Sequence, residues 1–195
     1  MSLRRPRIHP LAVLLVALGL VLGSCGGGVD DTSGDGYIGG VKKITPVEPQ
    51  DRVAMPELTG VDLDGNEIST ADFEGKTLVI NLWGSWCPPC REEAPVLREV
   101  SENLADDNVQ FIGILTKDKP AAAKAFNTKA GITYPSIVDE DGRLQLAFAK
   151  SLPSQAIPTT WVIDKNGKVA ARIIDDQLSV NTLTDIITWT RKSTP

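Results

Sequence analysis

The sequence predicts an α/β protein with a mixed central sheet flanked by helices. Two apolar, β-rich runs, at 77–83 and 109–115, are each followed by a segment with helical character. Nearer the C-terminus, two further strand runs are joined by the turn sequence at 164–167 and are followed by a helix. The alternating part favours parallel strands and the hairpin adds an antiparallel pair, so one mixed sheet accounts for both.

The first half of the predicted domain begins with a hairpin at 61–68, where turn residues separate two alternating runs. After the strand at 77–83, two prolines open a helix that apolar spacing extends over 88–105. Pro95 lies within that helix and is expected to kink it.

The second half repeats the strand and helix signals and ends on a helix. Residues 51–195 form one domain, long enough to bury a full core without any disulfide. After the strand at 109–115, the expected elements are a helix at 120–129, a strand at 136–138, a short helix at 143–150, strands at 159–163 and 168–174, and a helix from near Ser179.

The N-terminus is typical of an export signal. Three arginines precede an apolar run at 11–22, which is well short of the ~20 residues needed to span a bilayer as a helix. The run ends in Leu22-Gly23-Ser24-Cys25, which resembles the lipobox of bacterial lipoproteins. We therefore expect residues 1–24 to be a lipoprotein signal peptide and Cys25 to carry lipid. The alternative is an ordinary secretory signal in which Cys25 is idle.

The segment after this cysteine has the composition of a linker. Residues 25–50 are rich in glycine, aspartate, serine and threonine and end in a proline-containing stretch. We expect this segment to be a flexible tether between the lipid and the domain that begins near Asp51. The protein would then lie on the extracytoplasmic face of the bacterial cell membrane.

Composition excludes several kinds of chemistry. A formal net charge of −5 gives no broad attraction to nucleic acid. The single histidine, His9, lies in the segment expected to be cleaved, so the mature chain would lack histidine-based catalysis and histidine metal ligands. The two remaining cysteines cannot form a four-cysteine zinc site. No metal or cofactor is therefore expected.

Cys87 and Cys90 form a C-x-x-C motif between a buried strand and a helix. This placement brings both sulfurs to a helix N-terminus, where the helix dipole stabilises a thiolate. Cys87 is expected to be exposed and to act as the nucleophile, and Cys90 to be shielded and to act as the resolving thiol. A static disulfide is the alternative, but closing so short a loop gains little chain entropy.

The residues around the motif resemble a known family. Asn81-Leu82-Trp83-Gly84-Ser85-Trp86-Cys87-Pro88-Pro89-Cys90-Arg91-Glu92-Glu93-Ala94-Pro95 is similar to the active-site signature of membrane-tethered thioredoxin-like reductases of the TlpA and ResA type. The similarity covers roughly 56–189 and includes the block at 157–164. It implies a thioredoxin-like fold with an N-terminal β-hairpin extension and an inserted strand–helix element, which 61–68 and 136–150 fit.

The resemblance also implies roles for single residues. Pro158 matches the family's cis-proline that faces the cysteines, and the backbone of Ile157 can pair with a substrate strand there. Thr159 follows them in the same substrate-binding segment. Trp86 is interpreted as active-site packing and substrate contact, whereas Trp83 is expected in the core.

Glu93 lies three residues after Cys90, where the family has a glutamate that tunes proton transfer at the cysteines. Asn81 stands where thioredoxin itself has a buried acid, so that role is either absent or moves to Glu93. We expect Glu93 to be partly desolvated by Trp86. The alternative is a solvated helix glutamate.

The resemblance implies a disulfide reductase that acts on exported proteins such as apocytochrome c and receives electrons from a membrane thiol donor of the CcdA or DsbD type. Asn81 and the two prolines between the cysteines argue against a strong oxidant. Two alternatives stay open. One is an oxidase or isomerase for secreted-protein disulfides, and the other is a non-enzymatic lipoprotein binding module with a structural disulfide.

Overall fold

The computed structural model describes residues 42–195. The predicted signal peptide at 1–24, the lipid-attachment residue Cys25 and most of the predicted tether lie outside the described residues. Within the described part of the chain, no helix is both long enough and apolar enough to cross a membrane.

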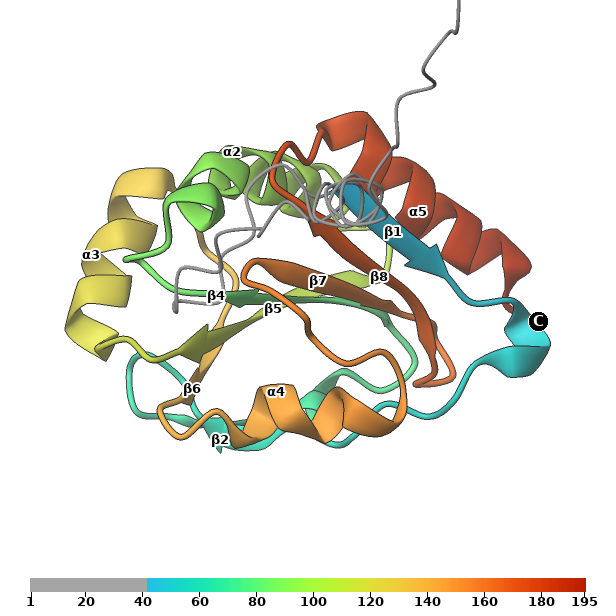
Figure 1. Cartoon of the computed structure of the whole chain (residues 1–195), viewed down its shortest axis with the longest axis horizontal. Helices are drawn as coiled ribbons and strands as arrows, with labels where there is room; N and C mark the ends of the chain where they lie inside the picture. The colour runs from blue at the N-terminus through green and yellow to red at the C-terminus, as the bar shows by residue number, and fades with distance from the viewer. Residues whose placement is uncertain (1–41) are drawn as a thin grey trace, which may run out of the picture. The chain divides into compact units, whose positions relative to one another are not determined.

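Six strands form the central sheet, in the order β1-β8-β7-β4-β5-β6 (Figure 1). β4, β5 and β6 are parallel, and the other neighbouring pairs are antiparallel, which confirms the predicted mixed sheet. The strands are β1 (Lys42–Pro46), β4 (Thr77–Trp83), β5 (Val109–Thr116), β6 (Ser136–Asp139), β7 (Thr159–Ile163) and β8 (Val169–Asp175).

Helices cover both faces of this sheet. In Figure 1, α2 and α5 lie above the sheet, whereas α4 and the β2 strand lie below it. The α-helices are α2 (Pro88–Asn103), α3 (Pro120–Ala130), α4 (Arg143–Ala147) and α5 (Val180–Ser193). Short 3-10 helices are η1 (Pro49–Asp51), η2 (Thr70–Phe73) and η3 (Phe148–Lys150), so the predicted helix at 143–150 is one α-helical and one 3-10 segment.

The predicted N-terminal hairpin is present as β2 (Thr59–Val61) and β3 (Glu67–Ser69). Asp62 closes its turn, because one carboxylate oxygen accepts hydrogen bonds from the backbone nitrogens of Asp64 and Asn66. The strands are shorter than the alternating pattern suggests, since the five residues between them, 62–66, form the turn.

The expected domain start near Asp51 is corrected by the structure, because β1 lies within the predicted tether. Lys42–Pro46 pairs antiparallel with β8 at the edge of the central sheet. An edge strand can contain a proline because one side of its backbone needs no ladder hydrogen bonds. The sequence pattern did not predict this strand, because two of its five residues are lysines and one is a proline.

Two apolar layers hold the helices to the sheet. Because side chains alternate along a strand, Val79 of β4 faces α2 and α5, whereas Ile80 faces the hairpin and α4. On the latter face the rings of Phe148 and Trp161 are stacked with centroids 4.1 Å apart. Every residue of β4 is buried, which explains why five of its seven residues are apolar.

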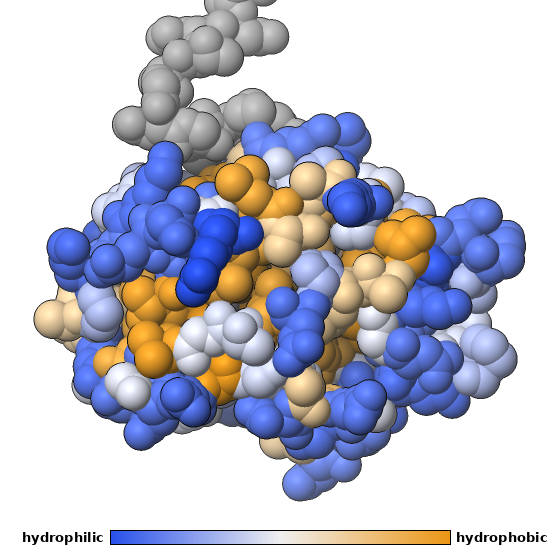
Figure 2. Space-filling model, turned by 90° about the horizontal axis from the view of Figure 1, so that it is seen from below, coloured by the Kyte–Doolittle hydropathy of each residue, from blue (hydrophilic) through white to orange (hydrophobic). Residues whose placement is uncertain are grey.

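The face of the molecule beneath the sheet is partly apolar at its surface. Figure 2 shows apolar side chains gathered in the middle of this face, with hydrophilic ones around them. Among the described residues, Leu146 of α4 and Val61 of β2 are large apolar residues that are exposed.

Candidate active site

Cys87 and Cys90 are joined by a disulfide at the N-terminus of α2, with their Cα atoms 5.3 Å apart. Cys87 is the N-cap residue, and its sulfur accepts a hydrogen bond from the backbone nitrogen of Cys90 over 3.3 Å. Pro88 and Pro89 have no N–H, so Cys90 carries the first helical N–H that can reach this sulfur. One backbone donor thus remains to stabilise a thiolate on Cys87.

The expectation that Cys87 is exposed is wrong for the disulfide form. Cys87 is 2% exposed and Cys90 is 3% exposed, so accessibility does not distinguish the two sulfurs. They belong to a small apolar cluster with Trp83, against which Phe126 and Ile157 pack. Side chains from α3 and from the segment before β7 therefore cover the disulfide.

The two tryptophans beside the motif differ as expected. Trp83 is buried, and its indole N–H donates to the Ser136 hydroxyl over 3.2 Å. Trp86 is 40% exposed, and its indole N–H donates to the carbonyl oxygen of Thr116 over 3.4 Å. The ring of Trp86 therefore leaves an apolar surface exposed one residue before Cys87 in the chain.

Asp118 anchors the loop that carries the cysteines. One of its carboxylate oxygens accepts a hydrogen bond from the backbone nitrogen of Ser85 over 2.6 Å. Sequence reasoning missed Asp118. Its position just after β5 could have indicated that Asp118 lies near the cysteine loop, because loops that follow adjacent parallel strands meet at the same edge of a sheet.

The Ile157–Pro158 peptide bond is cis, as the resemblance implied for Pro158. Ile157 packs against the cysteine cluster, which places this segment beside the disulfide. Thr159 is fully buried, and its hydroxyl donates to the carbonyl oxygen of Ala156 over 2.6 Å. The Thr159 side chain therefore holds this segment in place.

Two more side chains hold the chain that leads to Pro158. The Trp161 indole N–H donates to the Leu152 carbonyl oxygen, and the Arg172 guanidinium donates to the Pro153 carbonyl oxygen, each over 2.6 Å. Both donors come from strands of the central sheet. The segment next to the cysteines is thus fixed by side chains of the central sheet.

Glu93 is 4% exposed, so it is not a solvated helix glutamate. Its Oε1 atom accepts a hydrogen bond from the side-chain nitrogen of Asn81 over 2.7 Å. Burial raises the pKa of Glu93 to about 8, against the lowering effect of the Asn81 hydrogen bond, and the charge of Asp175 adds to the rise. The carboxyl group is therefore mostly protonated at pH 7, and the smaller ionised fraction can accept a proton.

Desolvation of Glu93 by Trp86 stays a prediction, and the structure identifies other neighbours. The groups that act on it are Asn81 on β4, Asp175 at the end of β8 and Tyr134 in the loop before β6. Burial first, and then the Glu93 carboxyl, raise the pKa of Tyr134 above its usual range. Sequence reasoning named neither Tyr134 nor Asp175, because they are far from the motif along the chain.

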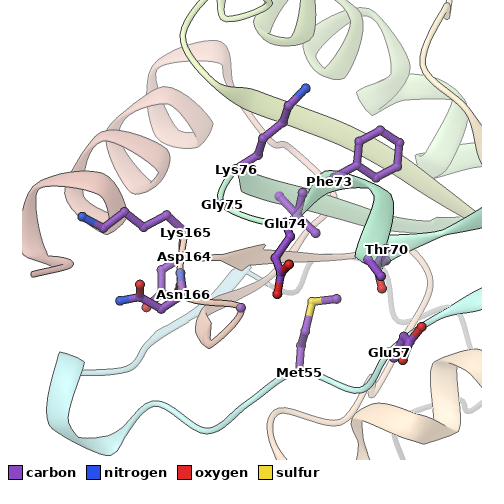
Figure 3. Close-up of a pocket in the computed structure, with 13 residues that line it drawn as sticks. Met55, Glu57, Thr70, Phe73, Glu74, Gly75, Lys76, Asp164, Lys165 and Asn166 are labelled. Atoms are coloured by element: carbon purple, nitrogen blue, oxygen red, sulfur yellow. Dashed lines mark hydrogen bonds between the residues drawn. The ribbon is translucent and has the colours of Figure 1, made fainter.

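A cavity of about 500 Å³ lies at the opposite end of the sheet from the cysteines. It is lined by residues at the start of β4 and the end of β7, whereas Cys87 follows the end of β4. Figure 3 shows Met55 and Glu74 reaching into this cavity and Lys165 pointing away from it. It contains no cysteine among the described residues, so thiol chemistry belongs to the other end of the fold.

No cluster of three potential metal ligands occurs among residues 42–195. In the described part of the chain, the redox group is the Cys87–Cys90 pair. Such a pair stores two electrons by opening and closing one disulfide bond.

Comparison with known proteins agrees with this site. The redoxin family model matches residues 49–187. The thiol-disulfide oxidoreductase ResA of Bacillus anthracis is 30% identical over 122 residues, which cover 63% of this chain and 68% of the relative. ResA of Bacillus subtilis is 28% identical over 114 residues, which cover 58% and 62% of the two chains.

Solved structures show the same fold. A secreted thiol-disulfide isomerase from Corynebacterium glutamicum is 29% identical with a TM-score of 0.70, and the match covers 77% of this chain and 93% of that one. A DsbF homologue from Corynebacterium diphtheriae is 32% identical with a TM-score of 0.67, covering 78% and 96%. The chain therefore belongs to the redoxin family, as a thiol-disulfide oxidoreductase of the TlpA/ResA type with a thioredoxin-like fold.

Proposed function

We propose that the protein is a membrane-tethered, extracytoplasmic disulfide reductase that acts on exported proteins through the Cys87/Cys90 dithiol. The observation that carries this proposal is the position of the cysteine pair at the start of α2, packed against Ile157 before the cis-proline. A client strand that pairs with the Ile157 backbone would lie beside the sulfur of Cys87 at the exposed ring of Trp86.

The reaction begins with the reduced pair. The Cys87 thiolate attacks a client disulfide, forms a mixed disulfide and releases the first client sulfur as a thiolate. The Cys90 thiol then loses its proton and attacks the Cys87 sulfur, which releases the second client thiolate. The client gains two electrons and the cysteine pair loses two, ending as the Cys87–Cys90 disulfide.

The second step needs a group that accepts the proton of Cys90. Glu93 fits this role because it is buried on the same helix three residues beyond Cys90, and its pKa is raised to about 8. The fraction of Glu93 that is ionised would take the proton from the sulfur and return it to solvent or to a departing client thiolate. Glu93 would thus replace the buried acid for which this chain has Asn81.

The oxidised pair must be reduced again by two electrons from outside the chain. A membrane thiol donor of the CcdA or DsbD type fits this requirement, because exchange with another dithiol uses the same chemistry in reverse. Apocytochrome c fits the client side, since its haem-binding cysteines must be reduced before they can bind haem. The TlpA/ResA-type family supports both partners by resemblance.

Attachment to the membrane would occur through lipid on Cys25. The support is the order of positive charge, short apolar run, small residues and cysteine at 4–25. Cys25→Ala should release the protein from the membrane fraction while insulin reduction by the extracted protein stays the same. A Cys25→Ala variant that stays in the membrane fraction after signal cleavage would contradict the anchor.

An isomerase or oxidase of secreted-protein disulfides is the second candidate. The name of the solved Corynebacterium glutamicum relative, a secreted thiol-disulfide isomerase, favours it. The direction of electron flow separates the two candidates, because a reductase must have the lower reduction potential.

Insulin reduction with dithiothreitol as electron source tests the enzyme against a static disulfide. The wild-type chain should turn over insulin, and both Cys87→Ala and Cys90→Ala should abolish turnover. Cys25→Ala is the matched control, since it also removes one cysteine but should keep the activity. A wild-type chain that stays oxidised and inactive under mild reduction would make the disulfide structural and the protein a binding module.

A further inference from the structure

Asn81 connects three parts of the active site through one side-chain amide. Its nitrogen donates to Oε1 of Glu93 over 2.7 Å and to the hydroxyl oxygen of Thr160 over 3.1 Å. All three side chains are nearly or fully buried. An amide NH₂ group has two hydrogens, so these two acceptors use its whole donor capacity. The amide cannot rotate without breaking both bonds.

The sheet register explains this contact. Asn81 of β4 and Thr160 of β7 are directly opposite each other in the antiparallel pair. Opposite residues point to the same face of a sheet. Their strand neighbours Val79 and Val162 both pack in the layer beneath α2 and α5, so Asn81 and Thr160 also face α2. Glu93 reaches this position from α2.

The elements that meet here also carry the reacting groups. β4 leads directly into the loop of Cys87, α2 contains Cys90, and β7 begins just after the Ile157–Pro158 bond. A shift of any one of these elements would move the Glu93 carboxyl relative to the sulfurs. Acid–base catalysis depends on such placement at the scale of ~1 Å.

We propose that Asn81 is a positioning residue for thiol–disulfide exchange, which holds the Glu93 carboxyl group in place through an amide that Thr160 fixes in turn. Among the described residues, Oε2 of Glu93 accepts no such bond and so stays available to carry the exchanged proton. This inference rests on the proposed role of Glu93 as proton acceptor, and it assigns Asn81 and Thr160 no contact with substrate.

The charged and titratable groups around Glu93 set the direction of the expected effect. Asp175 faces it from β8 and Tyr134 from the loop before β6, while Cys87 and Cys90 precede it on its own segment. The hydrogen bond that Asn81 donates lowers the pKa of Glu93. Removing this donor leaves burial and Asp175 unopposed, so the pKa should rise.

The test is the insulin-reduction rate of the full chain from pH 5 to 10. Asn81→Ala should lower the rate at pH 7 by about tenfold or more. It should also move the inflection point of the plot of rate against pH upward by about one pH unit. Thr160→Val keeps the β-branched shape and should move the inflection in the same direction by less. Thr77→Val, a buried threonine on the same strand as Asn81 but at its other end, is the matched control and should not move it.

A double variant separates positioning from a loss of packing. In a Glu93→Gln background, adding Asn81→Ala should leave the pH profile unchanged, because no titrating carboxyl remains to be positioned. Urea unfolding of each variant shows whether it is folded, and Thr160→Val carries the test if Asn81→Ala does not fold.

A loss of rate by the same factor at every pH, with the inflection in place, would make Asn81 a packing residue and overturn the proposal. An equal shift in the Glu93→Gln background would overturn it as well. If Glu93→Gln alone has the wild-type profile, there is no proton exchange at Glu93 to position, although exchange through Cys87 and Cys90 stands. Absence of insulin reduction by the wild-type chain would instead reject the proposed function itself.

Discussion

Arg52 forms a buried ion pair with Asp164, with Nη1 and Oδ2 3.0 Å apart. The same guanidinium also donates to the hydroxyls of Thr194 and Ser193 and lies over the ring of Trp189. The contacts join the segment after β1 to the β7–β8 turn and to the end of α5. The segment that follows β1 and η1 is thereby joined to the C-terminal helix.

Replacing Arg52 by methionine should destabilise the fold by about 3–5 kcal/mol, because Asp164 would remain buried without its cation. The measurement is the free energy of unfolding in urea. Arg98→Met is the matched control, since Arg98 pairs with Glu102 over 3.2 Å on the exposed surface of α2 and should contribute little. Equal losses for the two variants would show that the Arg52 pair is no stronger than a surface pair.

Gly113 leaves space for the hydrogen bond between Trp83 and Ser136. A Cβ atom at this position would lie 2.6 Å from Nε1 of Trp83, which real contacts do not allow. Gly113→Ala should therefore destabilise the protein by about 1–3 kcal/mol. It should also change the fluorescence of Trp83, because the indole loses its partner. An unchanged urea midpoint and emission spectrum would contradict this account.

The neutral Glu93 carboxyl should make stability fall as pH rises. Its pKa is raised from 4.5 to about 8 in the folded state, so between these values the folded chain holds a proton that the unfolded chain has lost. The stabilisation is complete below about pH 4.5 and is lost as pH rises toward 8, with a limiting slope of about 1.4 kcal/mol per pH unit.

Glu93→Gln should remove this part of the slope, since glutamine does not titrate. The measurement is urea unfolding of both proteins between pH 5 and 9. Glu92→Gln is the matched control, because Glu92 is the adjacent exposed glutamate and should keep the wild-type slope. If wild type and Glu93→Gln have parallel pH profiles, Glu93 is ionised in the folded protein at neutral pH.

The two cysteines should differ in the covalent complexes they form. Cys90→Ala should trap mixed disulfides with client proteins, because the Cys87 thiol can attack but nothing resolves the product. Cys87→Ala should trap few. Complexes are counted on non-reducing gels, and samples treated with dithiothreitol show which of them are held by disulfides. Equal trapping by both variants would overturn the assignment of Cys87 as the nucleophile.

Much of the fold was predictable because the buried strands carry a strong signal. The bounds of Thr77–Trp83 and Thr159–Ile163 agree with the sequence pattern, since every residue in both strands is buried. β1 was missed because a short edge strand is half solvated and can hold lysine and proline. The domain boundary was placed too late for the same reason.

The candidate site likewise has residues that the sequence pattern predicts and contacts that only the fold creates. The cysteine pair, Pro158 and Glu93 lie in or near recognisable motifs, so the sequence identified them. The contact of Asn81 with Thr160 joins residues 79 positions apart that only the register of β4 and β7 brings together. The burial of Cys87 also depends on side chains from α3 and the Ile157 segment, which no local pattern places.

The reduction potential of the Cys87/Cys90 pair tests the reductase account most directly. The chain would be equilibrated in graded dithiothreitol or glutathione redox buffers, and its free thiols alkylated and counted, with Cys87→Ala as the blank. A reductase should have a low potential, near the value of about −270 mV typical of thioredoxin. A potential near −120 mV, as in the strong oxidant DsbA, would contradict the reductase account and make the protein an oxidase.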